Sequence, residues 1–142
     1  MVQIVNKSKH EQLVQGSEHA AGYDIRANVD APIILLPRNI KVIPTGVYVS
    51  LPEDIELQVR PRSGLSIKGI TVINTPGTID ADYRGEIKII LINHSSEPFA
   101  VEDGQRIAQV VFNKVEHPTF VEVDVLTPTV RGSGGFGSTG EK

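Results

Sequence analysis

The chain has 142 residues, of which 39% are hydrophobic, 22% are charged and only 5% are aromatic, and it contains neither Cys nor Trp. This length fits one domain with a modest core and leaves no room for a second one, so packing between subunits is expected to add stability. Fourteen Lys and Arg against seventeen Asp and Glu give a net charge of -3, which argues against a protein that binds nucleic acid through a basic face.

The absence of Cys excludes disulfides and thiolate metal sites from this sequence. Residues 1–5 lead into polar residues rather than into the apolar stretch of a signal peptide, and no apolar run is long enough to span a bilayer. Four His residues lack the spacing of metal ligands and are predicted to lie on the surface: His10, His19, His94 and His117. The sequence therefore predicts a soluble, cytoplasmic protein with no membrane partner.

Apolar and polar residues alternate with a period of two over 55–60 and 120–125, which predicts a half-buried strand in each segment. Runs rich in β-branched residues predict further strands over 33–36, 40–43, 47–51, 71–73, 86–92 and 106–115. Nine Pro and thirteen Gly separate these runs, and a single helical turn is expected around 65–68. Short strands joined by tight turns predict an all-β fold, which is a sandwich, a jelly roll or a small barrel.

Several segments carry residue types that suit a phosphate or base site, although each also has a simpler structural interpretation. Asp24, in the segment 21–27, either serves such a site or only accepts backbone hydrogen bonds in a turn. The run of Arg62, Ser63 and Gly64 is either a strand-to-helix turn with Ser63 as N-cap or an anion site. Gln109 lies in a segment whose composition is common in strands.

Residues 74–86 place three carboxylates, a phenol and an amide within thirteen positions. The turn signals at 76–77 and 84–85 predict a β-hairpin arm, whichever function the segment has. These charges fit either an exposed hairpin or a binding site, and the amide of Asn74 has the donors and the acceptor needed to pair with a base edge.

Residues 127–142 are rich in Gly and Ser and lack a core-forming pattern, which fits a flexible tail. Arg131 and Phe136 favour a different interpretation, because a cation and a lone aromatic ring suit a clamp on a phosphate and a base. Glycines around them let backbone N–H groups approach oxygen atoms. We therefore expect a β domain over 1–126 and an arm over 127–142.

Together and in this order, these segments resemble the five sequence motifs of the trimeric deoxyuridine triphosphatase (dUTPase) family, over residues 21–140. The most specific matches are GTIDADYRGE at 77–86 and RGSGGFGSTG at 131–140. The resemblance implies a jelly-roll-like β-clip subunit and a homotrimer with active sites shared between subunits. It also implies hydrolysis of dUTP to dUMP and pyrophosphate by water attack at the α-phosphate, which keeps uracil out of DNA and supplies dUMP for thymidylate synthesis.

The resemblance further implies a role for each matching residue. Asp80 activates the attacking water, Gln109 bonds the α-phosphate or the water, and Tyr83 excludes ribose by lying under the deoxyribose. Mg²⁺ accompanies the triphosphate, with Asp24 reaching it through a water. The remaining substrate-binding residues are Arg62, Ser63 and Gly64 for the phosphates, Asn74, Gly77, Thr78, Ile79 and Lys88 for uracil, and Arg131, Phe136, Gly137, Ser138 and Thr139 in the closing arm. Asp82 and Glu86 are assigned structural roles.

Two alternatives remain open at this point. A dCTP deaminase shares the trimeric β fold and would release ammonia, but the intact segment 77–86 and the glycine-rich arm favour a dUTPase. A dUTP-responsive regulatory protein would bind the same nucleotide, with hydrolysis as a secondary property. The connector 65–73 is one residue shorter than in typical bacterial dUTPases, which predicts a shortened helix there.

Overall fold

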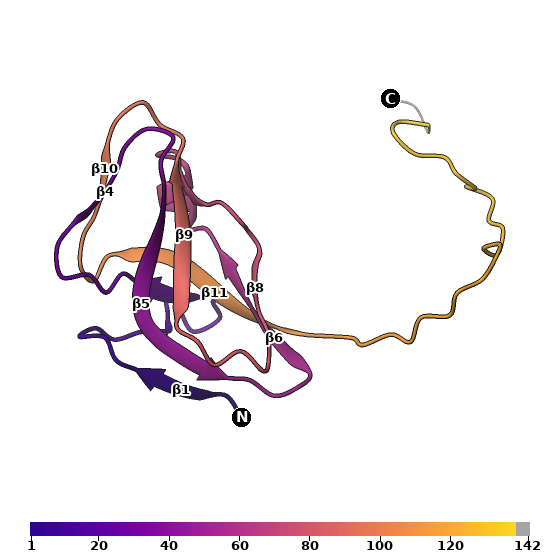
Figure 1. The fold of residues 1–142 in the computed structure, drawn as a ribbon, viewed down its shortest axis with the longest axis horizontal. Helices are drawn as coiled ribbons and strands as arrows, with labels where there is room; N and C mark the ends of the chain where they lie inside the picture. The colour runs from indigo at the N-terminus through magenta and orange to yellow at the C-terminus, as the bar shows by residue number, and fades with distance from the viewer. Residues whose placement is uncertain (139–142) are drawn as a thin grey trace.

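The computed structural model describes residues 1–138 and consists almost entirely of β-strands (Figure 1). One short helix, α1 (Ser63–Ser66), follows the sixth strand. The strands are β1 (Gln3–Asn6), β2 (Val14–Gln15), β3 (Tyr23–Arg26), β4 (Ile33–Leu35), β5 (Ile40–Ser50), β6 (Ile55–Arg60), β7 (Ile70–Val72), β8 (Gly77–Ile79), β9 (Ile87–Asn93), β10 (Phe99–Val101) and β11 (Arg106–Lys114). The all-β prediction is confirmed. Among the described residues, no helix has the length and apolar character needed to traverse a membrane.

The strands form three antiparallel sheets. A four-stranded sheet has the order β1-β5-β9-β7, a five-stranded sheet has the order β2-β3-β11-β6-β8, and β4 pairs with β10 alone. Figure 1 shows β5 and β9 running side by side, and β11 of the other sheet crosses behind them in this view. A single cluster of buried hydrophobic side chains includes residues of both larger sheets, so the two sheets share one core.

Strand β6 illustrates how the sequence produces this core. Leu57 and Val59 are buried, whereas the intervening Glu56, Gln58 and Arg60 are only half-buried. This is the alternation required of a strand with one face on a core and the other near solvent. Each fully buried Leu or Ile side chain contributes about 1.5–3 kcal/mol relative to leaving it exposed, and the completely buried ones on the central strands include Ile43, Leu57, Ile87, Ile89 and Leu91.

The segments 40–43 and 47–51, predicted as separate strands, form the single long strand β5. The register of its pairing with β9 shifts between Pro44 and Val47, which marks a β-bulge. A bulge leaves N–H groups outside the ladder, so side chains or other segments must accept their hydrogen bonds.

The strand predicted over 120–125 is absent, and the prediction is wrong. Residues 115–138 contain no strand and run away from the body of the molecule (Figure 1). Phe120 and Val121 are 90% and 79% exposed. The alternation there has the period of a strand, but none of the sheet edges in the described residues pairs with it, and an unpaired strand is not stable alone.

The hairpin predicted over 74–86 is also wrong, because its two ends join different sheets. Strand β8 pairs with β6, whereas β9 pairs with β5 and β7. The turn signals correctly mark bends, but the chain crosses between layers there rather than pairing with itself. At α1 the segment forms a strand-to-helix turn, but Arg62 rather than Ser63 occupies the N-cap and makes no side-chain cap hydrogen bond, so the interpretation of Ser63 as N-cap does not hold.

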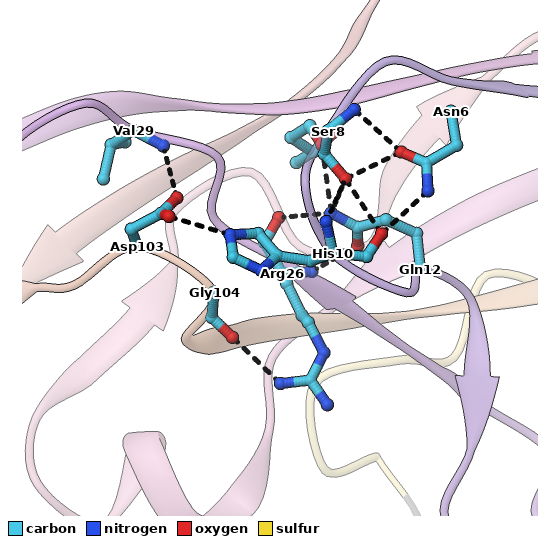
Figure 2. Close-up of polar contacts among 9 residues, drawn as sticks. Asn6, Ser8, His10, Gln12, Arg26, Val29, Asp103 and Gly104 are labelled. Atoms are coloured by element: carbon cyan, nitrogen blue, oxygen red, sulfur yellow. Dashed lines mark hydrogen bonds and ion pairs between the residues drawn. The ribbon is translucent and has the colours of Figure 1, made fainter.

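Polar contacts attach the N-terminal segment to the rest of the fold (Figure 2). The buried amide of Gln12 donates to the carbonyl of Arg26 at 3.1 Å and accepts from its N–H at 2.7 Å. His10 Nε2 lies 2.9 Å from Asp103 Oδ2, and the other oxygen of Asp103 accepts the N–H of Val29 at 3.0 Å. The hydrogen bonds from His10 and then Val29 lower the pKa of Asp103 below its ordinary value. The His10 side chain is only 23% exposed, so the surface prediction is wrong for this His.

Replacing Asp103 with Asn should lower the melting temperature at neutral pH, because the amide loses the contacts that the carboxylate makes with His10 Nε2 at 2.9 Å and with the N–H of Val29 at 3.0 Å as a charged acceptor. Since folding lowers the pKa of Asp103, its stabilisation is present above the pKa of the unfolded chain and is lost as the pH falls through the folded value. The difference in melting temperature between wild type and Asp103→Asn, measured by calorimetry, should therefore shrink below about pH 4.

Glu102→Gln is the matched control, because Glu102 lies in the same turn and its carboxylate makes no hydrogen bond or ion pair within residues 1–138. Its effect on the melting temperature should be small at every pH. A difference for Asp103→Asn that does not change with pH would contradict a stabilising role for the ionised carboxylate of Asp103.

Candidate active site

A hollow of about 370 Å³ opens where β3 and β11 meet the residues that join β6 to α1. Five predicted site residues line it: Asp24, Arg62, Ser63, Gly64 and Gln109. Sheet register explains their proximity, because Asp24 on β3 pairs with Gln109 on β11, and Gln109 pairs with the last residue of β6. The structure thus brings together three segments that are distant in sequence.

Asp24 binds two guanidinium groups. Arg62 Nε lies 2.8 Å from one carboxylate oxygen and Arg106 Nη1 lies 3.0 Å from the other. The Asp24 side chain is 15% exposed, whereas those of Arg62 and Arg106 are 27% and 49% exposed. Two cations for one carboxylate leave an excess of positive charge beside the hollow, and the open guanidinium edges suit the oxygens of a phosphate.

The sequence interpretation missed Arg106, although this residue begins the segment that contains Gln109. With strict alternation, residues three apart in a strand point to opposite faces. The pairing of β11 with β3 shifts register between Arg106 and Ala108, and this irregularity puts Arg106 on the same face as Gln109. The sequence shows only that Arg106 stands three positions before Gln109. This local pattern does not reveal the bulge that puts the two side chains on one face.

The side chain of Gln109 is held in one orientation. Its Nε2 donates to the carbonyl of Pro61 at 2.9 Å, which leaves the carbonyl oxygen Oε1 as a free acceptor. That oxygen lies against the α-carbon of Gly22, where a Cβ atom would overlap it. Gly22 is therefore needed for this orientation, and an acceptor so placed is able to bind a water or a protonated group.

Ser63 and Gly64 begin α1 and are exposed, whereas Leu65 of the same helix is buried and anchors it. The first N–H groups of a helix have no acceptor within it. Together with the Ser63 hydroxyl and the Arg62 guanidinium, these groups form a set of donors that converges on the hollow.

The donor set of this hollow limits how it would hold a metal. Asp24 has the single carboxylate among the described residues that line it, and residues 1–138 contain no group of three or more His, Asp or Glu side chains placed to hold an ion. Such a site fits Mg²⁺ only when waters and ligand oxygens complete the coordination, as this small cation commonly prefers.

The motif 77–86 lies at a second hollow, of about 880 Å³, which Thr78 and Asp80 line. Asn74 and Tyr83 are exposed and line neither hollow. The Asn74 side chain folds back over Gly77, where a Cβ atom would lie 2.9 Å from its Nδ2. Gly77 and Ile79 belong to β8, and Lys88 lies on β9 with its side chain 53% exposed and 3.8 Å from a carboxylate oxygen of Glu86.

The two hollows lie at opposite ends of β6. Asp80 directly follows Ile79, which pairs with Leu57, whereas Gln109 pairs with Arg60 on the other edge of the strand. With a rise of about 3.3 Å per residue and about 4.8 Å between strands, Asp80 and Gln109 are roughly 16 Å apart in one chain. One water molecule cannot contact both side chains of the same chain.

The predicted arm is separate from both hollows. Phe136 is fully exposed, and within residues 1–138 Arg131 Nε donates only to the carbonyl of Gly134, at 2.9 Å. Gly137 and Ser138 lie in the same exposed segment, which Figure 1 shows extending away from the sheets. Thr139 lies outside the described residues.

Known proteins share these sequence and structural features. The profile of the dUTPase family matches residues 8–140. The deoxyuridine 5'-triphosphate nucleotidohydrolase of Cytophaga hutchinsonii is 52% identical over 141 residues, which cover 99% of this chain and 92% of that protein. The protein of the same name from Thermoanaerobacter sp. is 56% identical over 125 residues, which cover 87% of this chain and 84% of that protein.

The structure of Staphylococcus bacteriophage 80alpha dUTPase with dUPNHPP is similar to this chain with a TM-score of 0.89 and 28% identity, over 99% of this chain and 98% of that one. This likeness confirms the jelly-roll-like β-clip fold. Because the family profile and these relatives match nearly the whole sequence, the chain belongs to the dUTPase family.

Proposed function

We infer that this chain hydrolyses dUTP to dUMP and pyrophosphate at an active site shared between the subunits of a homotrimer. One observation supports this most strongly: in a single chain the predicted site residues lie in three separate places, which are the hollow beside α1, the segment 74–88 at the second hollow, and the detached arm. Neighbouring copies would bring these parts together. Apolar side chains left half-exposed around β4 and β5 support subunit contacts there, among them Ile34, Ile40 and Val42.

The phosphate side of the shared site is the hollow beside α1. Arg62, Ser63 and Gly64 bind the triphosphate, and Arg106 adds a second guanidinium that sequence motifs did not indicate. Because Asp24 already orients both guanidiniums, less side-chain freedom is lost when phosphate binds. Mg²⁺, bound mainly by phosphate oxygens and water and reached by Asp24 through a water, would neutralise the triphosphate charge.

The hydrolytic step requires one activated water at the α-phosphorus. Asp80 of one subunit accepts a proton from this water as its oxygen bonds to phosphorus. The bond between the α-phosphorus and the bridging oxygen breaks, and pyrophosphate leaves with that oxygen. Gln109 of a second subunit, with Oε1 free as an acceptor, orients the water or the phosphate from the other side.

The segment 74–88, which borders the second hollow at Thr78 and Asp80, supplies recognition of the nucleoside. Backbone groups over 77–79 and the Asn74 amide pair with the edge of uracil, and the backbone near Lys88 adds a contact. Cytosine would place hydrogen-bond donors opposite the donors of this segment. Each buried group left unpaired costs about 1–3 kcal/mol. The ring of Tyr83 lies under deoxyribose and leaves no volume for a 2′-hydroxyl.

The arm, residues 127–142, closes the site after the substrate binds. Phe136 stacks over uracil, while Arg131 and the N–H groups of Gly137 and Ser138 cover the terminal phosphates. The β domain then comprises residues 1–126. A cytoplasmic location is part of the proposal, since the substrate is a soluble nucleotide.

Pyrophosphate release from dUTP, dCTP, dTTP and UTP, each with and without Mg²⁺, tests the function. The proposal predicts release from dUTP in the presence of Mg²⁺ and far less from dCTP and UTP, because the base edge and the sugar are both recognised. Thymine has the same hydrogen-bonding edge as uracil, so dTTP tests whether the site also senses the 5-position of the base. Ammonia release from dCTP is measured in parallel. Ammonia as the main product would identify a deaminase and contradict the proposed hydrolysis.

Asp80→Asn should retain dUTP binding but lower turnover by about 10²–10⁴-fold, the usual contribution of a positioned general base. Single-turnover kinetics and nucleotide binding measured on the same preparation separate these effects. Asp82→Asn is the matched control: Asp82 is an exposed carboxylate that lines the same hollow two residues away, but the proposed mechanism gives it no proton to accept, so turnover should change little. Near-normal turnover in the folded Asp80→Asn enzyme would remove Asp80 from the mechanism.

A further inference from the structure

Tyr83 is exposed on one side, yet the structure restrains its ring on the other. A Cβ atom built on Gly85 would lie 2.8 Å from Cε2 of Tyr83 and closer still to Cζ and Oη. Real Cβ atoms essentially never approach heavy atoms below 3.0 Å. The ring therefore occupies the space that any side chain at position 85 would need.

The hydroxyl of Tyr83 is also held. It donates to the backbone carbonyl of Glu86 at 3.0 Å, and the backbone N–H of Tyr83 donates to the carbonyl of Asp80 at 3.1 Å. Both contacts are made within the loop between β8 and β9. The hydroxyl thus serves as an anchor for the ring, whose exposed side remains available to a ligand, since 43% of Tyr83 is exposed.

Glu86 connects this anchor to the core. Its carboxylate oxygen Oε1 accepts the N–H groups of Thr45 and Gly46, at 3.1 and 2.9 Å, in the bulge of β5. The buried Thr45 hydroxyl donates to the carbonyl of Ile87, the next residue. The carbonyl that receives the Tyr83 hydroxyl therefore belongs to a residue attached to the central sheet through its own side chain.

We propose that Gly85 is a positioning residue for sugar specificity: it lets the Tyr83 ring rest against the backbone, with its hydroxyl anchored at Glu86, where the ring excludes a 2′-hydroxyl. This inference rests on the role of Tyr83 in the proposed function. The Tyr83 ring excludes a sugar with one additional oxygen atom by steric clash only if the ring stays within a fraction of an ångström of its position. An exposed Tyr without these restraints would sample other rotamers.

Gly85→Ala tests the proposal without damage to the fold. Gly85 is not among the glycines with positive φ, so Ala is compatible with the backbone there. The obstacle to the new methyl group is the end of an exposed side chain, so the Tyr83 ring should swing outwards while the core is unchanged. The melting temperature should stay close to that of the wild type.

The measured quantity is the ratio of kcat/KM for dUTP to that for UTP. A hydrophobic contact that senses one added group commonly discriminates by about 10–200-fold, so Gly85→Ala should lower the ratio by roughly tenfold. The same substitution in a Tyr83→Ala background should leave the ratio unchanged, because no ring remains to be positioned. Tyr83→Phe, which keeps the ring but loses the anchor to Glu86, should lower the ratio by less than Gly85→Ala.

Each outcome distinguishes the positioning proposal from the function on which it rests. An unchanged ratio in Gly85→Ala, with a lowered ratio in Tyr83→Ala, would overturn the positioning role and leave the role of Tyr83 intact. An equal effect of Gly85→Ala with and without Tyr83 would overturn it too, since Gly85 would then act through another group. An unchanged ratio in Tyr83→Ala would contradict both the positioning role of Gly85 and the role of Tyr83 in sugar discrimination. If Gly85→Ala does not fold, an unchanged ratio in Tyr83→Phe would contradict the anchored ring.

Discussion

The pairing of β6 with β11 on one edge and with β8 on the other determines where the chemistry of this chain lies. This register holds Gln109 near the last residue of β6 and Asp80 near its first residues. Neither side chain is able to approach the other without breaking the ladder hydrogen bonds of the five-stranded sheet. In the proposed mechanism, a water molecule that needs both groups would receive them from different chains, so assembly would be a condition for catalysis and not only a source of stability.

The polar groups of each hollow are oriented by their own chain before a ligand arrives. Asp24 binds the guanidinium of Arg62, the carbonyl of Pro61 orients Gln109, and the hydroxyl of Tyr83 is anchored in its own loop. Groups fixed in advance lose little freedom on binding and need little reorganisation during the reaction. The described arm residues contrast with them, because their hydrogen bonds join only neighbouring residues. Rigid parts would thus hold the substrate, and the arm would close over it.

Sequence patterns predicted those features that depend on neighbouring residues. Alternation over 55–60 predicted β6 correctly, whereas the same alternation over 120–125 predicted a strand that the structure lacks. The two segments differ because 55–60 has neighbouring strands to pair with and 120–125 has none in the described residues. A local sequence pattern does not contain that information. The ion pairs of Asp24 with Arg62 and Arg106 join residues 38 and 82 positions apart, so no spacing rule reveals them. The family motifs indicated Asp24, Arg62 and Gln109, and the fold brings these three together.

Mixed trimers test the shared site most directly. One parent is a chain truncated after Val130, which keeps Asp80 but lacks the arm, and the other is full-length Asp80→Asn. After each parent alone is shown to be inactive, the two are refolded together in equal amounts and dUTP hydrolysis is measured. If the Asp80 loop and the arm of one site come from different subunits, about a quarter of the sites should regain activity, the fraction expected for random assembly of closed trimers. No recovered activity, with mixed trimers verified by native mass spectrometry, would contradict the account.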